Sequence, residues 1–235
     1  MSDDSNPEDQ EPELTEDEKL EREIKARNKQ LCLERSGIPR VFWGIKFKWP
    51  DSSSTQDFKK FNIWIDDIPG VYEAVDNLFI EGIDRWNRTA VVSLVGQNIM
   101  NTDNVYNRET IGYKHHIEAD PLGYSQPFRF IMMDENKLVS LHRKLERDEE
   151  DITFEEEVSM YDFFCLLEFG DDWVTTYKRK VIGELLAIRK EAMLPTIITI
   201  KRNPGYATDK NENAIYEELG RFFVGGTHIK LEGRR

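Results

Sequence analysis

Long apolar runs are absent from this 235-residue chain, and cysteine is scarce. No apolar run approaches the roughly 18 residues of a membrane-spanning helix, so the sequence predicts no such helix. Cys32 and Cys165 are the only cysteines, and their positions do not have metal-ligand spacing. We therefore expect two reduced thiols and no metal site. The acidic N-terminus is unlike a secretory signal peptide, and a cytoplasmic location is expected.

Residues 1–12 contain no aromatic or aliphatic side chain apart from Met1, and we expect a disordered acidic tail there. Residues 1–23 hold eleven acidic side chains against Lys19 and Arg22, so this segment carries about −9 of the net charge of −13. The rest of the chain is nearly balanced. The acidic composition therefore does not exclude a local nucleic-acid-binding face on the folded domain.

A helix start follows the tail. Thr15 and Glu18 have the spacing of a capping box, in which each side chain caps the backbone of the other. The sequence predicts an N-terminal helix within residues 13–36, with a narrow apolar stripe. Two interpretations stay open: the helix packs on its own domain, or the stripe is a partner-binding arm. The residues of the stripe are Leu20, Ile24 and Leu31.

Short uncharged strands alternate with amphipathic helices through the rest of the chain. This alternation is typical of a parallel sheet covered by helices on both faces. The expected strands span residues 77–81, 128–133, 163–167, 196–200 and 227–231. The expected helices span residues 90–99, 174–193 and 211–223, and a further helix is capped by Asp134. The polar connector at 101–127 is long for a loop inside a compact domain.

Residues 78–89 have the skeleton of a phosphate-binding P-loop. An apolar strand leads to Gly82, and a basic residue and a threonine, Arg88 and Thr89, open the next helix. A working P-loop is rich in glycine, because successive backbone N–H groups must point at the phosphates. Bulky residues fill this interior at 85–87, and Arg88 replaces the usual lysine. The motif is vestigial, with Gly82, Arg88 and Thr89 as its candidate nucleotide-binding residues.

Further segments follow the P-loop skeleton in a consistent order. They are an entry motif at 34–40, a strand and helix from 130, an apolar strand at 161–170 that ends in glycine, and a strand at 194–199. In this order, residues 33–235 resemble the AAA+ ATPase domain of DnaC/DnaI-type replicative helicase loaders and of IstB-type transposition helpers. The resemblance implies an α/β P-loop NTPase fold (AAA+/ASCE-like) over residues 37–235, with a parallel five-stranded sheet flanked by helices.

The residues that would hydrolyse ATP are altered. A Walker B strand supplies an Asp for Mg²⁺ and an adjacent acid that orients water. Leu167 stands at the metal position, and Glu168 remains as a vestigial catalytic group. Lys201 occupies the sensor position, and residues 215–219, where the resemblance places an arginine finger, contain no arginine. Since phosphoryl transfer depends on positioning and charge neutralisation, we expect a pseudo-ATPase without a cofactor. Binding of ATP and Mg²⁺ is the alternative.

Two basic clusters have open interpretations. Arg88 could grip a phosphate by its bidentate fork, or it could form a salt bridge with Glu168 or Asp171 across an empty site. Basic and aromatic residues also alternate after the entry motif, a combination suited to stacking on single-stranded DNA. The aromatic side chains could equally belong to the core. The candidate DNA-binding residues are Arg40, Trp43, Lys46 and Lys48.

Three functions are consistent with these residues. The resemblance favours a DNA replication accessory protein, a non-hydrolysing helicase-loader-like pseudo-ATPase that binds a replicative helicase or an active loader. Such a protein could act as a homo- or hetero-oligomer, and a degenerate loader would suit a phage or another mobile element. The first alternative is a divergent but active ATPase helicase loader. The second is an IstB-like DNA-binding transposition helper.

Overall fold

The computed structural model describes residues 15–44, 55–82, 84–102, 128–147, 152–169, 175–200 and 226–231. The helices are α1 (Glu16–Arg35), the 3₁₀ turn η1 (Arg40–Phe42), α2 (Thr55–Asp66), α3 (Ile68–Ala74), α4 (Arg85–Asn101), α5 (Glu135–Arg147), α6 (Phe154–Ser159) and α7 (Thr176–Glu191). The strands are β1 (Leu78–Gly82), β2 (Phe130–Asp134), β3 (Phe163–Phe169), β4 (Thr196–Ile200) and β5 (Thr227–Leu231). Several predictions lie outside the described residues: the tail 1–12, the connector from 103 to 127, the helix 211–223, the segment 215–219, Lys46, Lys48, Asp171 and Lys201.

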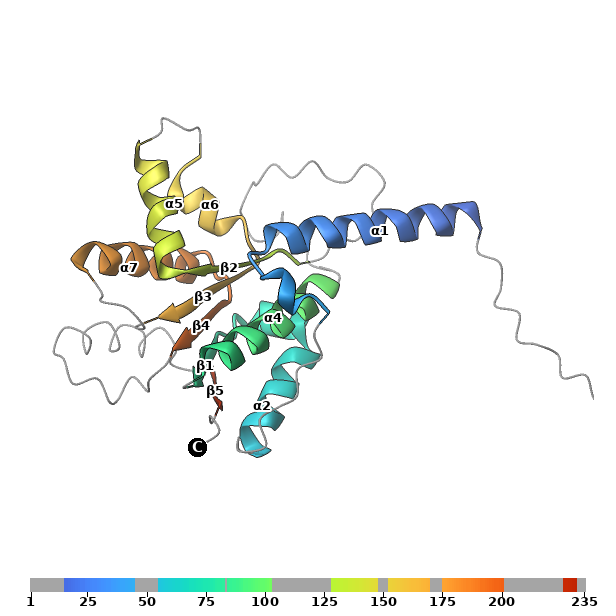
Figure 1. The fold of residues 1–235 in the computed structure, drawn as a ribbon, viewed down its shortest axis with the longest axis horizontal. Coiled ribbons are helices and arrows are strands. Elements are labelled where there is room, and N and C mark those ends of the chain that lie inside the picture. The colour runs from blue at the N-terminus through green and yellow to red at the C-terminus, as the bar shows by residue number, and fades with distance from the viewer. Residues whose placement is uncertain are drawn as a thin grey trace, which may run out of the picture.

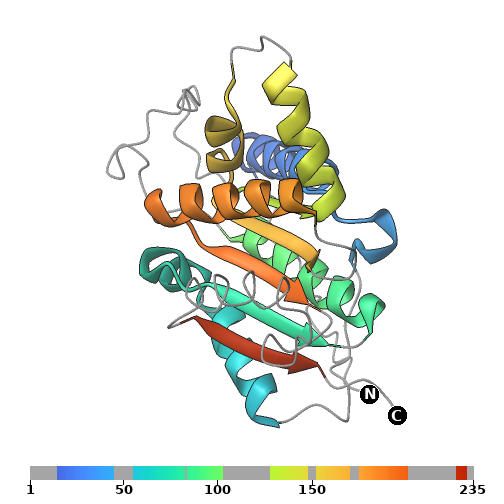
Figure 2. The same cartoon turned by 90° about the vertical axis from the view of Figure 1, so that its left-hand side faces the viewer.

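The five described strands form one parallel sheet in the order β2-β3-β4-β1-β5. Figure 2 shows the sheet with helices on both sides. The predicted α/β fold with a parallel five-stranded sheet is therefore confirmed. Each strand begins and ends within two residues of its prediction, because an apolar run between turn residues defines a buried strand well.

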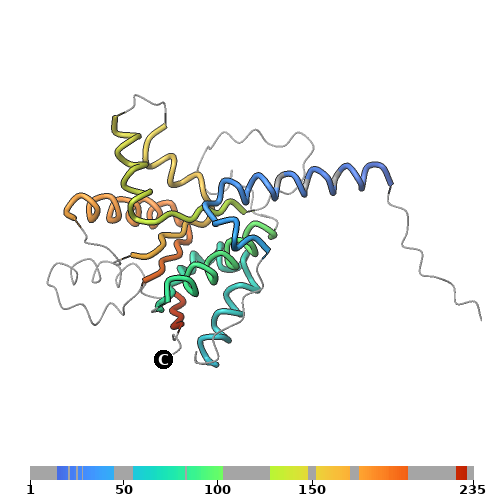
Figure 3. The backbone as a smooth tube through the Cα atoms, in the orientation of Figure 1, coloured from blue at the N-terminus to red at the C-terminus, as the bar shows by residue number. Residues whose placement is uncertain are grey.

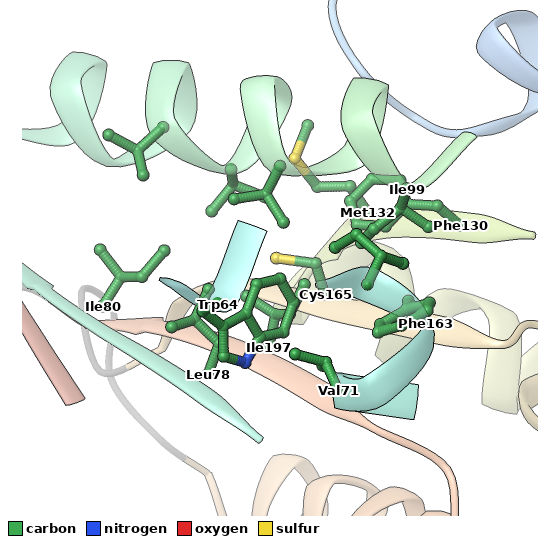
Figure 4. Close-up of a cluster of buried hydrophobic side chains, with 14 of the residues drawn as sticks. Trp64, Val71, Leu78, Ile80, Ile99, Phe130, Met132, Phe163, Cys165 and Ile197 are labelled. Atoms are coloured by element: carbon green, nitrogen blue, oxygen red, sulfur yellow. The ribbon is translucent and has the colours of Figure 1, made fainter. Parts of the chain in front are cut away.

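Alternate residues of the strands contribute to two separate cores. On β1, Leu78 and Ile80 face the core formed with α2, α3, α4 and the end of α1, whereas Phe79 faces the core formed with α5, α6 and α7. Figure 4 shows the first core, in which Trp64 and Cys165 lie between α4 and the strands. This division is the expected result of the two-residue side-chain period of a strand that is buried on both faces.

Helices α2, α3 and α6 were not predicted from the sequence. Helix α3 begins with a Pro-Gly pair that is typical of a turn, yet Asp67 caps it by accepting the Gly70 N–H at 3.0 Å. Helix α6 is short, and its capping box, Thr153 with Glu156, is present in the sequence. The capping rule alone would therefore have located α6.

Helix α1 extends away from the rest of the molecule, as Figures 1 and 3 show. Its predicted capping box is confirmed: the Glu18 N–H donates to Thr15 Oγ1 at 3.3 Å, and the Thr15 N–H donates to Glu18 Oε2 at 2.7 Å. Near the C-terminal end of the helix, Cys32 and Leu33 pack against the first core. The helix is thus anchored at one end.

A glycine joint fixes this anchored end to the sheet. Gly37 has a φ of +76°, in the left-handed region that favours glycine. A Cβ at this position would lie 2.2 Å from the carbonyl oxygen of Met132. The close approach lets the Met132 N–H donate to the Ser36 carbonyl at 2.7 Å. The entry motif therefore attaches α1 to the edge strand β2.

A buried arginine ties the second core together. Arg189 of α7 is fully buried, and its guanidinium donates to the carbonyls of Val158, Tyr161, Asp162 and Pro195 at 2.6–3.1 Å. Its Nε donates to the Thr196 hydroxyl at 3.0 Å. Burial lowers the pKa of Arg189 to about 9, which leaves the group charged at neutral pH. One side chain thus holds α6, the start of β3 and the start of β4 to α7.

The two cysteines are free thiols, as predicted. Cys165 is completely buried on β3, and burial raises the pKa of its thiol well above the ordinary value. A protonated, enclosed thiol of this kind is chemically inert. In the part of the chain that the structure describes, no helix has the length and apolar character needed to cross a membrane.

Candidate functional site

The predicted P-loop is a direct turn from strand to helix. Strand β1 ends at Gly82, and α4 begins at Arg85, so the bulky residues expected in a loop form the first helical turn. The prediction that this helix opens at Arg88 and Thr89 was wrong by one turn. The physical reason is Asp84, whose side chain caps the helix, together with the lack of glycines that would favour an open loop.

Asp84 caps the first turn of α4. Its Oδ1 accepts the Asn87 N–H at 3.2 Å, and its carbonyl accepts the Arg88 N–H at 3.1 Å. Free N–H groups and the positive end of the dipole make a helix N-terminus an anion site. At α4 the Asp84 carboxylate already lies at this position. Its negative charge repels a second anion, and its atoms take the space that the anion would need.

Two of the vestigial P-loop residues form hydrogen bonds within the protein. Arg88 is completely buried, and its Nη1 donates to the Gly82 carbonyl. The Thr89 hydroxyl donates to the Arg85 carbonyl at 2.9 Å, within the helix. Arg85 forms an ion pair with Glu168, because the earlier helix start puts Arg85 on the side of α4 that faces β3. The predicted pairing of Arg88 with Glu168 or Asp171 stays a prediction.

Glu168 is held in a special backbone conformation. Its φ is +61°, and the pairing of β3 with β4 shifts register between Leu166 and Phe169. A non-glycine residue in the left-handed region is strained and needs support from its surroundings. The Glu168 N–H donates to the buried Thr199 hydroxyl at 2.8 Å and supplies part of that support. The bulge directs the Glu168 carboxylate toward the start of α4.

A cavity of about 620 Å³ opens beside these residues. Its walls come from the entry motif, the first turn of α4, and the carboxyl ends of β2 and β3. Glu168, Leu167 and Thr89 line it, whereas Gly82 and Arg88 are not part of its lining. Trp86 lies at the wall with 55% of its surface exposed. Its ring packs at a tilt against the ring of Phe42, with 4.5 Å between the ring centroids. The predicted site residues are thus only partly brought together.

The candidate DNA-binding residues that the structure describes lie in contact. The Arg40 guanidinium stacks over the Trp43 ring at 5.6 Å. Trp43 is half-buried against the first core, and its indole Nε1 donates to the Ile38 carbonyl at 3.0 Å. Arg40 is exposed, so it remains accessible to a ligand, whereas the Trp43 ring is partly committed to the fold.

Four site residues were not selected from the sequence: Asp84, Arg85, Asp134 and Lys137, all of which line the cavity. A signal for Asp84 was present, since an aspartate before an amphipathic run is a typical helix cap. Asp134 was identified as a cap, which is confirmed by the Lys137 N–H that donates to it at 2.8 Å. Its place at the cavity depends on sheet order, which one sequence does not reveal.

The parallel sheet in this strand order, with helices on both faces, defines the fold of an AAA+ P-loop NTPase domain. The chain is similar to the DnaC helicase loader, at 13% identity and a TM-score of 0.56, over 82% of this chain and 99% of that one. It is also similar to DnaI, at 14% identity and a TM-score of 0.51, over 88% of this chain and 98% of that one. No family model and no curated protein sequence matches the chain.

A replication initiator has the same fold. The chain is similar to DnaA bound to AMPPCP and single-stranded DNA, at 10% identity and a TM-score of 0.54. This match covers 84% of the chain and 51% of that protein. At these identities the likeness establishes the fold alone. The predicted resemblance to helicase-loader AAA+ domains is confirmed at that level, and the resemblance to transposition helpers stays a prediction.

Proposed function

We propose that this chain is a DNA replication accessory protein that binds a replicative helicase or an active helicase loader without hydrolysing ATP. Its likeness to the DnaC and DnaI structures over almost their whole length supports the replication role. The altered turn between β1 and α4 supports the loss of nucleotide chemistry. The chain would then act through its surfaces rather than through catalysis.

The observation that carries this proposal is the position of Asp84. Its carboxylate lies at the N-terminus of α4 and accepts the Asn87 N–H. Arg88, which replaces the usual lysine, donates to the Gly82 carbonyl, and Arg85 pairs with the vestigial Glu168. Leu167 cannot coordinate Mg²⁺. Each change removes a different part of the apparatus that positions and neutralises a phosphoryl group.

Helix α1 is the proposed partner-binding arm. Leu20 is 53% exposed and Leu31 is 41% exposed on α1, and among the described residues the helix packs against the first core through Cys32 and Leu33 near its C-terminal end. Ile24 completes the stripe and is half-buried. A narrow apolar stripe on a projecting helix is suited to a groove on another protein.

We expect no ATP hydrolysis above the protein-free background in multiple-turnover assays, with and without single-stranded DNA and the partner. The reason is that Asp84 caps the first turn of α4 and that Leu167 stands where an aspartate would hold Mg²⁺. The matched control is Glu168→Gln, which removes the vestigial acid and keeps its volume. Hydrolysis that this substitution abolishes would instead establish the divergent active ATPase.

A second function, contact with single-stranded DNA, is favoured by the exposed Arg40 that stacks on Trp43. Arginine and aromatic side chains together bind single strands without sequence preference. We expect Arg40→Ala to weaken binding of a labelled single-stranded oligonucleotide severalfold in fluorescence anisotropy. Lys190→Ala removes one positive charge at an exposed position of α7 and should leave oligonucleotide binding unchanged. Equal binding by both variants and the unmodified chain would exclude this contact.

A further inference from the structure

Helix α2 presents one large apolar side chain to solvent. Ile63 is 73% exposed, whereas Phe61 and Trp64 of the same helix are buried in the first core. A single exposed aliphatic residue is common on protein surfaces and does not by itself mark an interaction site. The side chains around Ile63 therefore decide whether this face binds another molecule.

Charged residues flank Ile63 in a pattern that is segregated by sign. Lys59 and Lys60 lie one turn before it. Asp66 and Asp67 lie one turn after it. Residues three or four positions apart on a helix lie on the same face, and all four charged residues are exposed in the structure. This surface, which we call the Ile63 face, thus has a basic half and an acidic half on either side of an apolar centre.

The stability of α2 itself does not account for this order of charges. The C-terminal end of a helix is the negative end of its dipole, where an acidic side chain is disfavoured, and α2 ends at Asp66. Lys60 lies 4.0 Å from Asp57, at the limit for an ion pair, and 47% of the Lys60 side chain is exposed. Asp67 has a local role, since it caps α3 by accepting the Gly70 N–H. The positions of Lys60 and Asp66 are better explained by charges outside the chain.

A cavity of about 290 Å³ opens beside Ile63. It lies between α2, α3 and the first residue of β5, and Val71 and Ala74 contribute apolar surface to it. Lys60 and Asp67 line the same cavity as Ile63, so these two charges lie on the face that the sequence spacing indicates. The Ile63 face thus combines a projecting aliphatic side chain with a recess that can accept one.

We propose that a second copy of this chain docks on the Ile63 face, with the two α2 helices antiparallel about a two-fold axis at Ile63. Such an interface uses the same surface on both copies and must be self-complementary. The axis brings Lys60 opposite Asp66 of the second copy, because the two positions are equally distant from Ile63. It brings Lys59 opposite Asp67 of the second copy in the same way. A parallel pair of helices would instead place like charges together, which is repulsive.

This dimer leaves α1 accessible. Figure 1 shows α2 and α1 on different sides of the molecule, so each copy would keep its arm exposed. The inference therefore stands apart from the proposed function. One helix face per copy buries less than the roughly 1,600 Å² of a standard interface, and we expect a dissociation constant on the order of 100 µM.

The test is sedimentation equilibrium of the full chain between about 5 and about 500 µM, a range that brackets this dissociation constant. We expect the mean mass to rise from monomer toward dimer across the range. Ile63→Asp puts two carboxylates at the axis and should keep the chain monomeric throughout. Because Ile63 is exposed, this variant should keep the melting temperature of the unmodified chain. A mass that stays at the monomer value, or a dimer that Ile63→Asp leaves intact, would overturn the inference.

Charge reversal tests the antiparallel arrangement. Lys60→Asp and Asp66→Lys each place like charges opposite one another and should weaken self-association about tenfold. An equimolar mixture of the two variants should dimerise again, because each position 60 then faces an opposite charge at position 66 of the other copy. Lys190→Asp on exposed α7 is the matched control and should leave the dimer unchanged. A mixture that associates no better than either variant alone would refute the antiparallel arrangement.

Discussion

Replacing both Leu20 and Ile24 by aspartate is expected to abolish binding of the replicative helicase or loader. Leu20 and Ile24 lie one turn apart on one face of α1, so the two aspartates put charge into the middle of the stripe. Loss of two buried aliphatic contacts should weaken binding by at least about a hundredfold. The measurement is pull-down of the purified partner, followed by surface plasmon resonance.

The domain should remain folded in this variant. Leu20 is exposed and lies on the part of α1 that extends from the body, so the melting temperature should change little. Ala26→Asp with Gln30→Asp is the matched control. It adds the same charge on another exposed face of α1 and should keep binding. If the Leu20 and Ile24 variant unfolds, the helix belongs to the core and the arm interpretation is wrong.

Arg189→Met is expected to destabilise the domain by about 3–5 kcal/mol. The substitution keeps an unbranched side chain but removes the donor to three buried carbonyls, to the part-buried Tyr161 carbonyl and to the Thr196 hydroxyl. A buried carbonyl that loses its charged donor is left without a hydrogen bond. The free-energy cost of this unpaired group is larger than the net contribution of the hydrogen bond to stability. For a domain of this size, the melting temperature should fall by about 10 °C.

Lys190→Met is the control for this effect. Lys190 is the next residue on α7 and is exposed, so the same substitution there removes a charge without touching the core. Its effect on thermal unfolding should be within about 0.5 kcal/mol. Arg189→Lys should lie between the two, because lysine keeps the charge but not the planar fork. Equal stability of Arg189→Met and Lys190→Met would show that the hydrogen bonds of Arg189 do not stabilise the domain.

The sheet could be predicted from the sequence because its strands are continuous apolar runs. The strand at Phe163–Phe169 and the strand at Thr196–Ile200 are both buried along most of their length, and such runs have few other interpretations in a soluble domain. The helices were harder. Helix α3 was missed because a Pro-Gly pair lies in its first turn. These two residues often end a helix, although proline is also common at a helix start.

The site could be predicted only in part. Composition showed that the P-loop lacks its glycines, and therefore that phosphate binding was doubtful. It did not show that Asp84 caps α4 or that Arg85 reaches Glu168, because both depend on where the helix begins. Helix boundaries are the least certain part of a sequence-based prediction. The convergence of Asp134 with Glu168 additionally requires that β2 and β3 be neighbours.

The chain shares its fold with a replication initiator that was solved with a nucleotide analogue. DnaA was solved with AMPPCP and single-stranded DNA, and the same architecture in this chain has a carboxylate at the N-terminus of α4. A shared fold does not fix a shared chemistry, which depends on the residues of the site.

Calorimetric titration of the full chain with ATP and Mg²⁺ tests most directly whether this site has lost its nucleotide. We predict no saturable heat of binding at micromolar protein and ligand, with the partner present or absent, because Asp84 occupies the anion position and Arg88 is buried. Binding of one ATP per chain with a micromolar dissociation constant, lost on Thr89→Val, would contradict this prediction and restore the P-loop as a working site.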